Sequence, residues 1–215
     1  MSLCHRIRLG AIGLVLSFGV GHGVAHAQAG KNTTVLNPNL ATEVEMLALP
    51  QIDQAAVSAI VAGRPYLRMS AFDAVVAGHV AAADREALYA GLFLPINLND
   101  VTREEILLVP GVGDRMAREF EEYRPYRALA EFRREMGKYV DATEVARLEQ
   151  FVFVPIDLNT ASDEDILSLP GIGARMLRKF KEYRPYRAIA EFRREMGKYV
   201  DANEVARMER YVTMK

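Results

Sequence analysis

The sequence predicts an all-α fold made of tandem units that are built from short helices. The chain matches itself at an offset of 60 residues, and its apolar residues recur at helical spacing, whereas no stretch alternates with period two. Of the 215 residues, 50% are apolar and 26% are charged, and the formal net charge is −1. This composition argues against a disordered chain and against a strongly basic nucleic-acid binder.

The first 27 residues have the pattern of a cleavable signal peptide. Two arginines precede an apolar run over residues 10–20, and Ala25-His26-Ala27 fits a cleavage site. The alternative is an uncleaved N-terminal anchor, although the run is short for a membrane span. Cleavage would change the net charge from −1 to −3 and would remove Cys4, the only cysteine. We therefore expect a periplasmic protein that begins near Gln28 and has no disulfide.

Three units of 60 residues are expected after a short linker at residues 28–35. Unit two (residues 96–155) aligns without gaps onto unit three (residues 156–215), and the stretch AEFRREMGKYVDA is identical in both. Unit one (residues 36–95) is a more divergent copy, which keeps the asparagines near its start and an Arg-Pro-Tyr sequence. The repeat predicts that all three units share one fold.

Unit three illustrates the first two helices that we expect in each unit. Ser162-x-x-Asp165 predicts a capping box ahead of a short apolar helix, which Pro170 and Gly171 end. The same capping pattern occurs at Thr42-x-x-Glu45 and Thr102-x-x-Glu105 in the other units. A second, basic helix is expected over residues 174–183, because its apolar residues recur at helical spacing.

Two further helices are expected in the second half of unit three. Arg184-Pro185-Tyr186 predicts a break, since proline fixes φ and disfavours α geometry at the preceding residue. A third helix is expected over residues 188–196, with Gly197 at its end. Asp201-x-x-Glu204 predicts the start of a fourth helix, in which Val205, Met208 and Val212 form the buried stripe.

The turn between the first two helices is the candidate binding site. It reads Val109-Pro110-Gly111-Val112-Gly113 in unit two and Leu169-Pro170-Gly171-Ile172-Gly173 in unit three. Glycine permits positive φ and removes side chains, so backbone N–H groups at the start of the next helix could reach an anion such as phosphate. Val112 or Ile172 would point into the core. The alternative is a tight turn that binds nothing.

This order of apolar helix, Pro-Gly-x-Gly turn and basic helix resembles the helix-hairpin-helix motif. The preceding Ile156-Asp157-Leu158-Asn159 and Thr-Ala-Ser resemble the lead-in of the ComEA family of DNA-uptake proteins. The resemblance covers units two and three and implies an exported or membrane-anchored competence protein that binds the backbones of double-stranded DNA without sequence preference. The DNA-binding residues that it implies are Gly171, Ile172, Gly173, Arg175, Arg178, Lys179, Gly111, Val112, Gly113 and Arg115.

The sequence departs from the family pattern in two places. The second Gly-x-Gly turn of the family keeps one glycine here, at Gly137 and at Gly197, so we expect this second turn to be structural. Unit one lacks both glycines of the first turn and carries Asp53 there. We therefore expect residues 36–95 to be a folding cap, or a surface for a periplasmic or membrane protein partner, without a role in DNA binding.

The charge of the units favours unit three as the DNA contact. Unit one has 3 basic and 6 acidic residues, unit two has 9 and 12, and unit three has 12 and 10. Only unit three is net positive, at +2. The alternative is that its basic helix is an ordinary solvated face.

Aromatic and paired basic residues allow two interpretations. Four tyrosines beside the Arg-Pro breaks could form a stacking surface for single strands, or they could close the helical core: Tyr123, Tyr126, Tyr183 and Tyr186. The arginine pairs Arg133-Arg134 and Arg193-Arg194 are expected to form ion pairs with glutamates at helical spacing: Glu131, Glu135, Glu191 and Glu195.

The sequence does not predict an enzyme, a metal site or a cofactor. His79 is the only histidine after the signal segment, and no phosphate-loop lysine or nucleophile elbow is present. The alternative is a metal-dependent nuclease centre, formed by carboxylates that are distant in sequence and come together in the folded protein. The rival to DNA binding is a periplasmic interaction or scaffold protein that has the fold without the ligand.

Overall fold

Each unit opens with a helix that starts at a capping box. The computed structural model describes residues 34–214, and within them the expected side chains cap α1 (Glu43–Leu47), α5 (Arg103–Ile106) and α9 (Asp163–Ser168). In α9, the Ser162 hydroxyl accepts from the N–H of Asp165, and the Asp165 carboxylate accepts from the N–H of Ser162. These reciprocal bonds satisfy N–H groups that a helix start leaves unpaired, so the predicted starts are confirmed.

The second helix of each unit follows the turn, and it is amphipathic in units two and three but mostly apolar in unit one. It forms α2 (Gln54–Ala62), α6 (Asp114–Glu122) and α10 (Ala174–Glu182). In α10 the aromatic ring of Phe180 is buried, while basic residues line the exposed face. The Arg-Pro-Tyr sequence ends the helix near the expected residue, because proline at this place cannot continue it.

The third and fourth helices complete each unit. The third is α3 (Met69–Ala77), α7 (Leu129–Met136) and α11 (Ile189–Met196), and the fourth is α4 (Ala82–Tyr89), α8 (Ala142–Leu148) and α12 (Ala202–Glu209). A short 3₁₀ helix, η1 (Glu149–Phe151), extends α8. Twelve α-helices thus form within residues 34–214, which confirms the all-α fold class.

Short parallel strands close the units, which the sequence did not predict. β1 (Ile96–Asn97) pairs with β2 (Val152–Phe153), and β3 (Ile156–Asp157) pairs with β4 (Val212–Thr213). In unit one a single bridge joins Leu36 to Leu92. Strands of two residues are too short to show a periodic pattern in sequence. Val212 is buried, but it lies in β4 and not in the helical stripe where it was expected.

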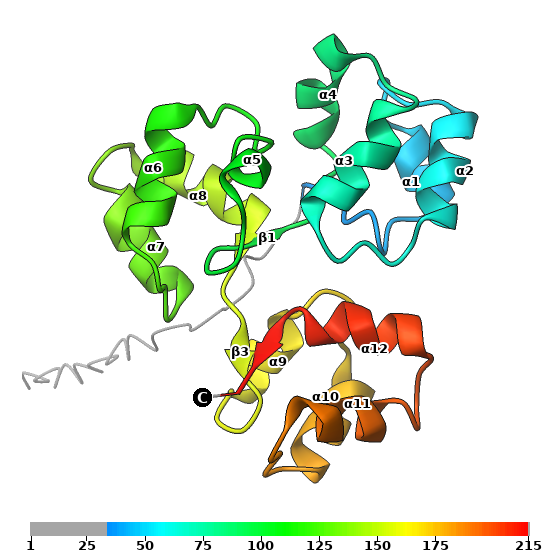
Figure 1. Ribbon diagram of the computed structural model, residues 1–215, viewed down its shortest axis with the longest axis vertical. Coiled ribbons are helices and arrows are strands. Elements are labelled where there is room, and N and C mark those ends of the chain that lie inside the picture. Colours follow the sequence, from blue (N-terminus) through cyan, green and yellow to red (C-terminus); the bar gives the residue numbers. More distant parts are fainter. Residues whose placement is uncertain (1–33, 215) are drawn as a thin grey trace, which may run out of the picture.

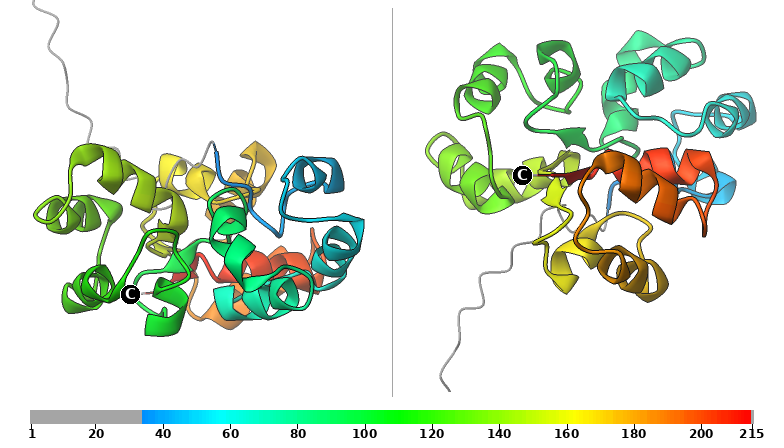
Figure 2. Two further views of the ribbon diagram at one scale, coloured as in Figure 1. Left: turned by 90° about the horizontal axis from the view of Figure 1, so that it is seen from above. Right: turned by 60° about the horizontal axis from the view of Figure 1, so that its bottom comes forward.

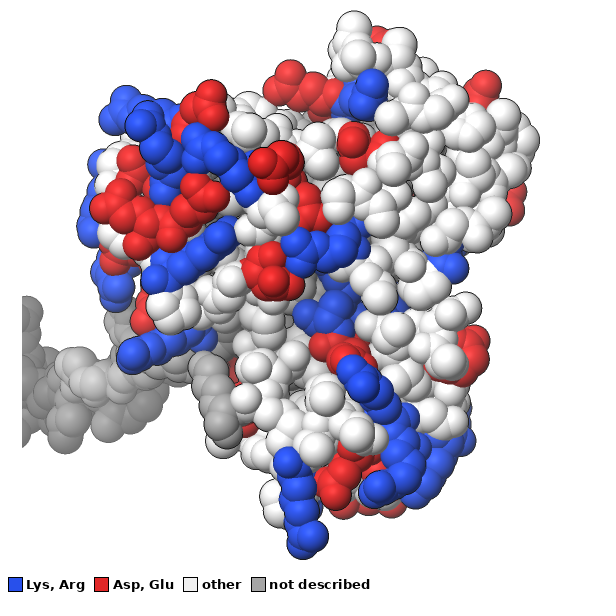
Figure 3. Space-filling model, viewed as in Figure 1, with Lys and Arg blue, Asp and Glu red and all other residues white. Residues whose placement is uncertain are grey.

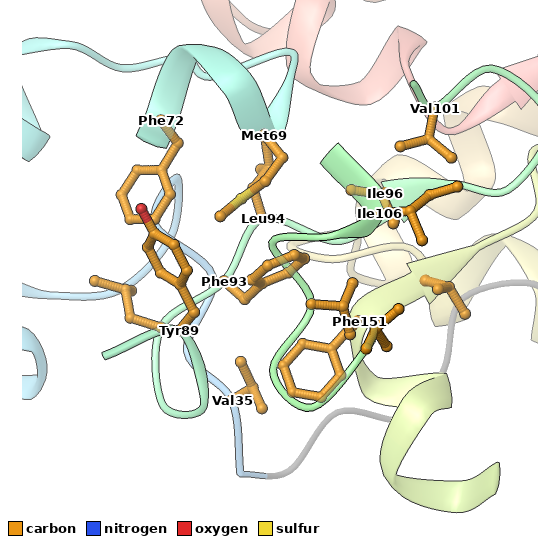
Figure 4. Packing of buried hydrophobic residues seen from close by; sticks show 14 of the residues in the cluster. Val35, Met69, Phe72, Tyr89, Phe93, Leu94, Ile96, Val101, Ile106 and Phe151 are labelled. Carbon is orange, nitrogen blue, oxygen red and sulfur yellow. The ribbon is translucent and has the colours of Figure 1, made fainter. Parts of the chain in front are cut away.

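Units one and two share one hydrophobic core, whereas unit three has its own. The ring of Phe93, from unit one, meets the ring of Phe151, from unit two, edge to face, with centroids 5.1 Å apart. Figure 4 shows these rings between the helices of the two units, with Met69 and Ile106 nearby. The second core contains the buried residues of unit three, such as Phe180 and Phe192, together with Phe153 from the end of unit two.

The three units are arranged around the closing strands. In Figure 1 unit one lies at the upper right, unit two at the upper left and unit three below, and Figure 2 shows the same grouping from two other sides. Nη2 of Arg68 in unit one forms an ion pair of 2.9 Å with the buried carboxylate of Glu105 in unit two. Arg210 of unit three donates to the carbonyl oxygen of Pro95 at 2.8 Å. Polar contacts therefore join all three units.

The expected signal peptide at residues 1–27 lies outside the described residues, as does most of the linker at 28–35. Within residues 34–214, none of the helices is both long and apolar enough to cross a bilayer.

Candidate nucleic-acid interface

The turn of unit three has the backbone conformation that its glycines allow. Gly171 has φ of 77°, in the left-handed region that favours glycine. Ile172 is buried in the core of unit three, as expected for the residue between the two glycines. Gly173 is extended, with φ of −108° and ψ of 179°, and it is the N-cap of α10. The turn is thus anchored by Ile172 while both glycines are exposed.

The start of α10 has unpaired backbone donors. Gly173 supplies no capping side chain, and within the described residues the N–H groups of Ala174, Arg175 and Met176 have no acceptor. In unit one, Asp53 occupies the matching position, and its carboxylate accepts from the N–H of Ala56 at 2.9 Å. Unit three therefore leaves unpaired the N–H of Met176, whose counterpart at Ala56 is satisfied within unit one.

The fold does not require glycine at position 173. A Cβ there would meet no atom within 4 Å, and the extended backbone suits any residue. Glycine at this position leaves open space in front of the free N–H groups. An exposed helix start of this kind attracts an anion, because the free donors and the helix dipole point toward it.

A buried arginine that sequence reasoning missed supports the turn from behind. The Arg207 side chain is only 4% exposed, donates to the carbonyl oxygen of Pro170, and contacts both carboxylate oxygens of Glu204 at 2.7 and 2.6 Å. Arg147 makes the same two contacts with Glu144 in unit two. The repeat alignment could have indicated this arginine, since the two units with a Pro-Gly-x-Gly turn carry arginine at this position whereas unit one carries Ala87.

The expected basic residues differ in their availability. Arg175 and Arg178 are exposed and form no ion pair within residues 34–214. Lys179 is engaged: its Nζ lies 2.7 Å from Glu182 and 4.6 Å from the ring centroid of Tyr199, and its side chain is 25% exposed. Figure 3 shows basic side chains on the lower part of the molecule, over unit three, and far fewer charges over unit one. The two arginines are thus better placed than Lys179 to meet a ligand.

The turn of unit two has the same shape but is already occupied. Gly111 has φ of 74°, Val112 is buried, and a Cβ on Gly113 would meet no atom within 4 Å. The N–H of Gly111, however, donates to Oε1 of Glu86 in unit one at 3.0 Å. Arg115 on α6 is exposed and has no ion-pair partner among the described residues.

An acidic residue also lies at the start of α6. Asp114 follows Gly113 directly, and its carboxylate is 2.9 Å from Arg103. Unit three has Ala174 at the matching position. The two turns therefore present different charges to a ligand.

The second turn of each unit differs from the first. Gly137 and Gly197 have φ of −62° and −61°, in the helical region, and each ends a helix. The hydroxyl of Tyr199, which follows Gly197, lies 2.7 Å from that of Tyr183, and Tyr139 and Tyr123 form the matching pair at 2.8 Å. Positive φ occurs within residues 34–214 only at Gly111 and Gly171.

Two of the four candidate tyrosines belong to the core. Tyr126 and Tyr186 are buried, and the Tyr186 hydroxyl donates to the carbonyl oxygen of Phe180 at 3.1 Å. Burial raises the pKa of Tyr186 above its ordinary value. These two rings cannot stack on bases, whereas Tyr123 and Tyr183 are half-buried.

The paired arginines form ion pairs, but not as helical spacing predicted. Arg133 pairs with Glu149 of η1 at 2.5 Å, and Arg193 pairs in the same way with Glu209 of α12. Arg134 contacts its direct neighbour Glu135 at 2.8 Å, and Arg194 contacts Glu195 at 2.9 Å. Glu131 and Glu191 instead accept from the backbone N–H groups of Arg127 and Arg187.

The described part of the chain brings no three histidine, cysteine, aspartate or glutamate side chains together in a group suited to a metal ion. Comparisons of the chain with protein families, with curated proteins and with solved structures gave no match.

Proposed function

We propose that the protein is an exported, non-sequence-specific binder of double-stranded DNA that contacts phosphates through the turn and helix start at Gly171–Gly173. The observation that carries the proposal is the open space at Gly173 in front of unpaired N–H groups. A phosphate oxygen can accept hydrogen bonds from such donors. The phosphates of duplex DNA are present whatever the base sequence, so such contacts would not select a sequence. Export is proposed from the signal pattern of residues 1–27.

Charge supports unit three as the main contact. Arg175 and Arg178 are exposed beside the free N–H groups, and unit three is the net-positive unit, at +2. Contacts to the phosphate backbone carry no sequence information, so binding would be general for duplex DNA. A role in retaining DNA during uptake, as the family resemblance implies, is part of the same proposal.

Binding of this kind has a defined salt dependence. The affinity of a protein for duplex DNA falls with salt by a slope of about 0.9 for each phosphate that it neutralises. A site with one open turn and two free arginines neutralises few phosphates. We therefore expect weak binding whose affinity decreases clearly with salt.

Fluorescence anisotropy of a labelled duplex, measured over a salt series, tests the proposal. Gly173→Asp places a carboxylate in the open space and should abolish binding with helical content nearly unchanged, because Asp53 already occupies this position in unit one. Gly113→Asp is the matched control: it adds the same charge to the turn that Glu86 occupies, so its effect should be much smaller. Equal binding by wild-type protein and Gly173→Asp would remove this turn from the mechanism.

The alternative function is a periplasmic interaction or scaffold protein. It is favoured by exposed apolar side chains on unit one, where Leu40 and Leu47 are each 41% exposed and Val44 is 79% exposed. Val44 replaces glutamate of units two and three, and Leu40 replaces aspartate and threonine. Absence of duplex binding even at low salt, with intact helical content, would favour this alternative.

A further inference from the structure

Unit one places one of its own carboxylates in the binding turn of unit two. Oε1 of Glu86, on α4, accepts a hydrogen bond of 3.0 Å from the N–H of Gly111. Gly111 is the counterpart of Gly171 in the turn proposed to bind phosphate. Carboxylate and phosphate oxygens are both anionic acceptors that suit such a donor. We propose that Glu86 is a built-in competitor that withholds the unit-two turn from DNA, an inference that rests on the proposed function.

The surroundings of Glu86 favour an anion at this place. Nη2 of Arg147 lies 3.2 Å from the position that a Cβ on Gly111 would occupy, so its guanidinium adjoins the turn. The pKa of Arg147 is raised, first by its hydrogen bonds with Glu144 and also by the charge of Glu86. A backbone donor and a cation therefore act on the same carboxylate.

The turn of unit three has the same features without a carboxylate. Gly171 has the same left-handed φ, and Arg207 lies behind it as Arg147 lies behind Gly111. The neighbour from unit one is Leu40 instead, whose Cδ2 lies 3.2 Å from the position of a Cβ on Gly171. Within residues 34–214 the N–H of Gly171 has no acceptor. The packing of unit one therefore distinguishes two turns that are nearly identical in sequence.

The contact between Glu86 and Gly111 can be removed without disturbing a core. Both residues are exposed, and Glu86 forms no ion pair among the described residues. An open cleft of about 420 Å³ lies between α4 and the turn, lined by Arg85, Glu86 and Gly111 among others. A volume of this size accommodates a phosphate group in place of the carboxylate. Shortening the Glu86 side chain should therefore convert the turn into an open anion site.

The test follows the amide signals of Gly111 and Gly171 by NMR in protein with ¹⁵N-labelled glycine. Inorganic phosphate and a short duplex are added separately to wild-type protein, to Glu86→Ala and to Asp84→Ala. Asp84 is the matched control, since its loss removes the same charge from the same helix and Asp84 has no side-chain partner in the described chain. In Glu86→Ala alone, we expect phosphate and duplex to shift the Gly111 amide. The salt slope of duplex binding should also steepen by about 0.9 in that variant, as for one more phosphate.

The outcomes separate this inference from the proposed function. A Gly111 amide that responds equally in wild-type protein, or that stays unchanged in Glu86→Ala, overturns the inference even if Gly171 responds to duplex. If phosphate shifts Gly111 only in Glu86→Ala while duplex shifts neither turn, occupation by Glu86 is supported and the DNA proposal fails. If the Gly111 amide responds as strongly in Asp84→Ala as in Glu86→Ala, the response reflects only the loss of one negative charge. That result would also overturn the inference.

Discussion

Asn159 and Tyr186 exchange two hydrogen bonds across unit three. Nδ2 of Asn159 donates to the carbonyl oxygen of Tyr186 at 3.0 Å, and Oδ1 of Asn159 accepts from the N–H of Tyr186 at 2.7 Å. The same pair occurs in the other two units as Asn39–Tyr66 and Asn99–Tyr126. The asparagine near the start of each unit therefore holds the Arg-Pro-Tyr break in place.

The arginine of the Arg-Pro-Tyr break binds the loop on either side of Asn159. Arg184 donates from Nε to the carbonyl oxygen of Leu158 at 2.7 Å and from Nη2 to that of Ala161 at 2.9 Å. These carbonyl groups belong to a partly buried loop, and such partners matter there because an unpaired buried polar group costs free energy. The asparagines and the Arg-Pro-Tyr sequence, which mark the repeat in all three units, thus pair with one another.

Replacement of Asn159 by alanine should lower the free energy of unfolding by about 2–3 kcal/mol, because two hydrogen bonds to partly buried backbone groups are lost. Urea denaturation followed by circular dichroism measures the change. Asn203→Ala is the control, since Asn203 is exposed on α12 and its side chain has no partner within residues 34–214. Equal stabilities of the two variants would contradict the structural role of the pair.

The two glycines of the unit-three turn should respond in opposite ways to substitution. Gly171→Ala should lower the free energy of unfolding by about 1–3 kcal/mol, because φ of 77° is strained for alanine and its Cβ would lie 2.8 Å from Nη2 of Arg207. Gly173→Asp should leave stability unchanged or raise it by about 0.3 kcal/mol, since aspartate caps a helix at least as well as glycine does. Thermal unfolding of both variants checks this, and equal losses would contradict it.

The salt dependence of duplex binding should identify which cations meet phosphate. Arg175→Ala and Arg178→Ala should each lower the slope of log affinity against log salt by about 0.9. Lys181→Ala should change it less, because Nζ of Lys181 already lies 2.6 Å from the carboxylate of Asp163. Anisotropy titrations at several salt concentrations give the slopes. A full change in slope for Lys181→Ala would contradict the assignment.

The contact between units one and two should weaken in acid because of Glu105. Burial raises the pKa of this carboxyl. Hydrogen bonds from the N–H and hydroxyl of Ser70 and from the N–H of Thr102, together with the charge of Arg68, lower the pKa by more than burial raises it. The pKa of Glu105 is therefore lower than its ordinary value. A carboxyl whose pKa is lower in the folded state stabilises the fold above its unfolded pKa, and this contribution is lost as pH falls through the folded pKa.

We therefore expect the thermal unfolding midpoint (Tm) of the wild-type protein to decrease as the pH drops below about 4, where glutamates protonate. Glu105→Gln should be less stable than wild type at neutral pH, and its midpoint should depend less on pH in the acid range. Unfolding midpoints of both proteins between neutral and acid pH provide the comparison. Parallel curves for the two proteins would show that Glu105 does not carry the effect.

The parts of the site that lie within a few residues could be predicted from sequence. The capping box at Ser162 and the inward position of Ile172 both follow from neighbouring residues, and both are confirmed. The left-handed Gly171 between two helices follows from the same local pattern. Such features depend on backbone geometry and on contacts between residues three or four apart, which a sequence displays directly.

Contacts between distant parts of the chain were missed or misjudged. Arg193 was expected to pair along its own helix, yet its partner is Glu209 on the neighbouring α12. The pairing of β3 with β4 joins residues at opposite ends of unit three. Neither contact has a local pattern, because both depend on how the helices pack after the chain folds back.

By itself, the sequence determined the helical repeat, the helix starts and the shape of both Pro-Gly-x-Gly turns, since hydrogen bonds and steric limits within one turn of backbone decide these features. Only the tertiary structure decided that the turn of unit two holds Glu86 while that of unit three adjoins Leu40. The physical reason is that two turns of nearly equal sequence acquire different neighbours when unit one packs against them, and the ligand available to a backbone N–H is set by those neighbours.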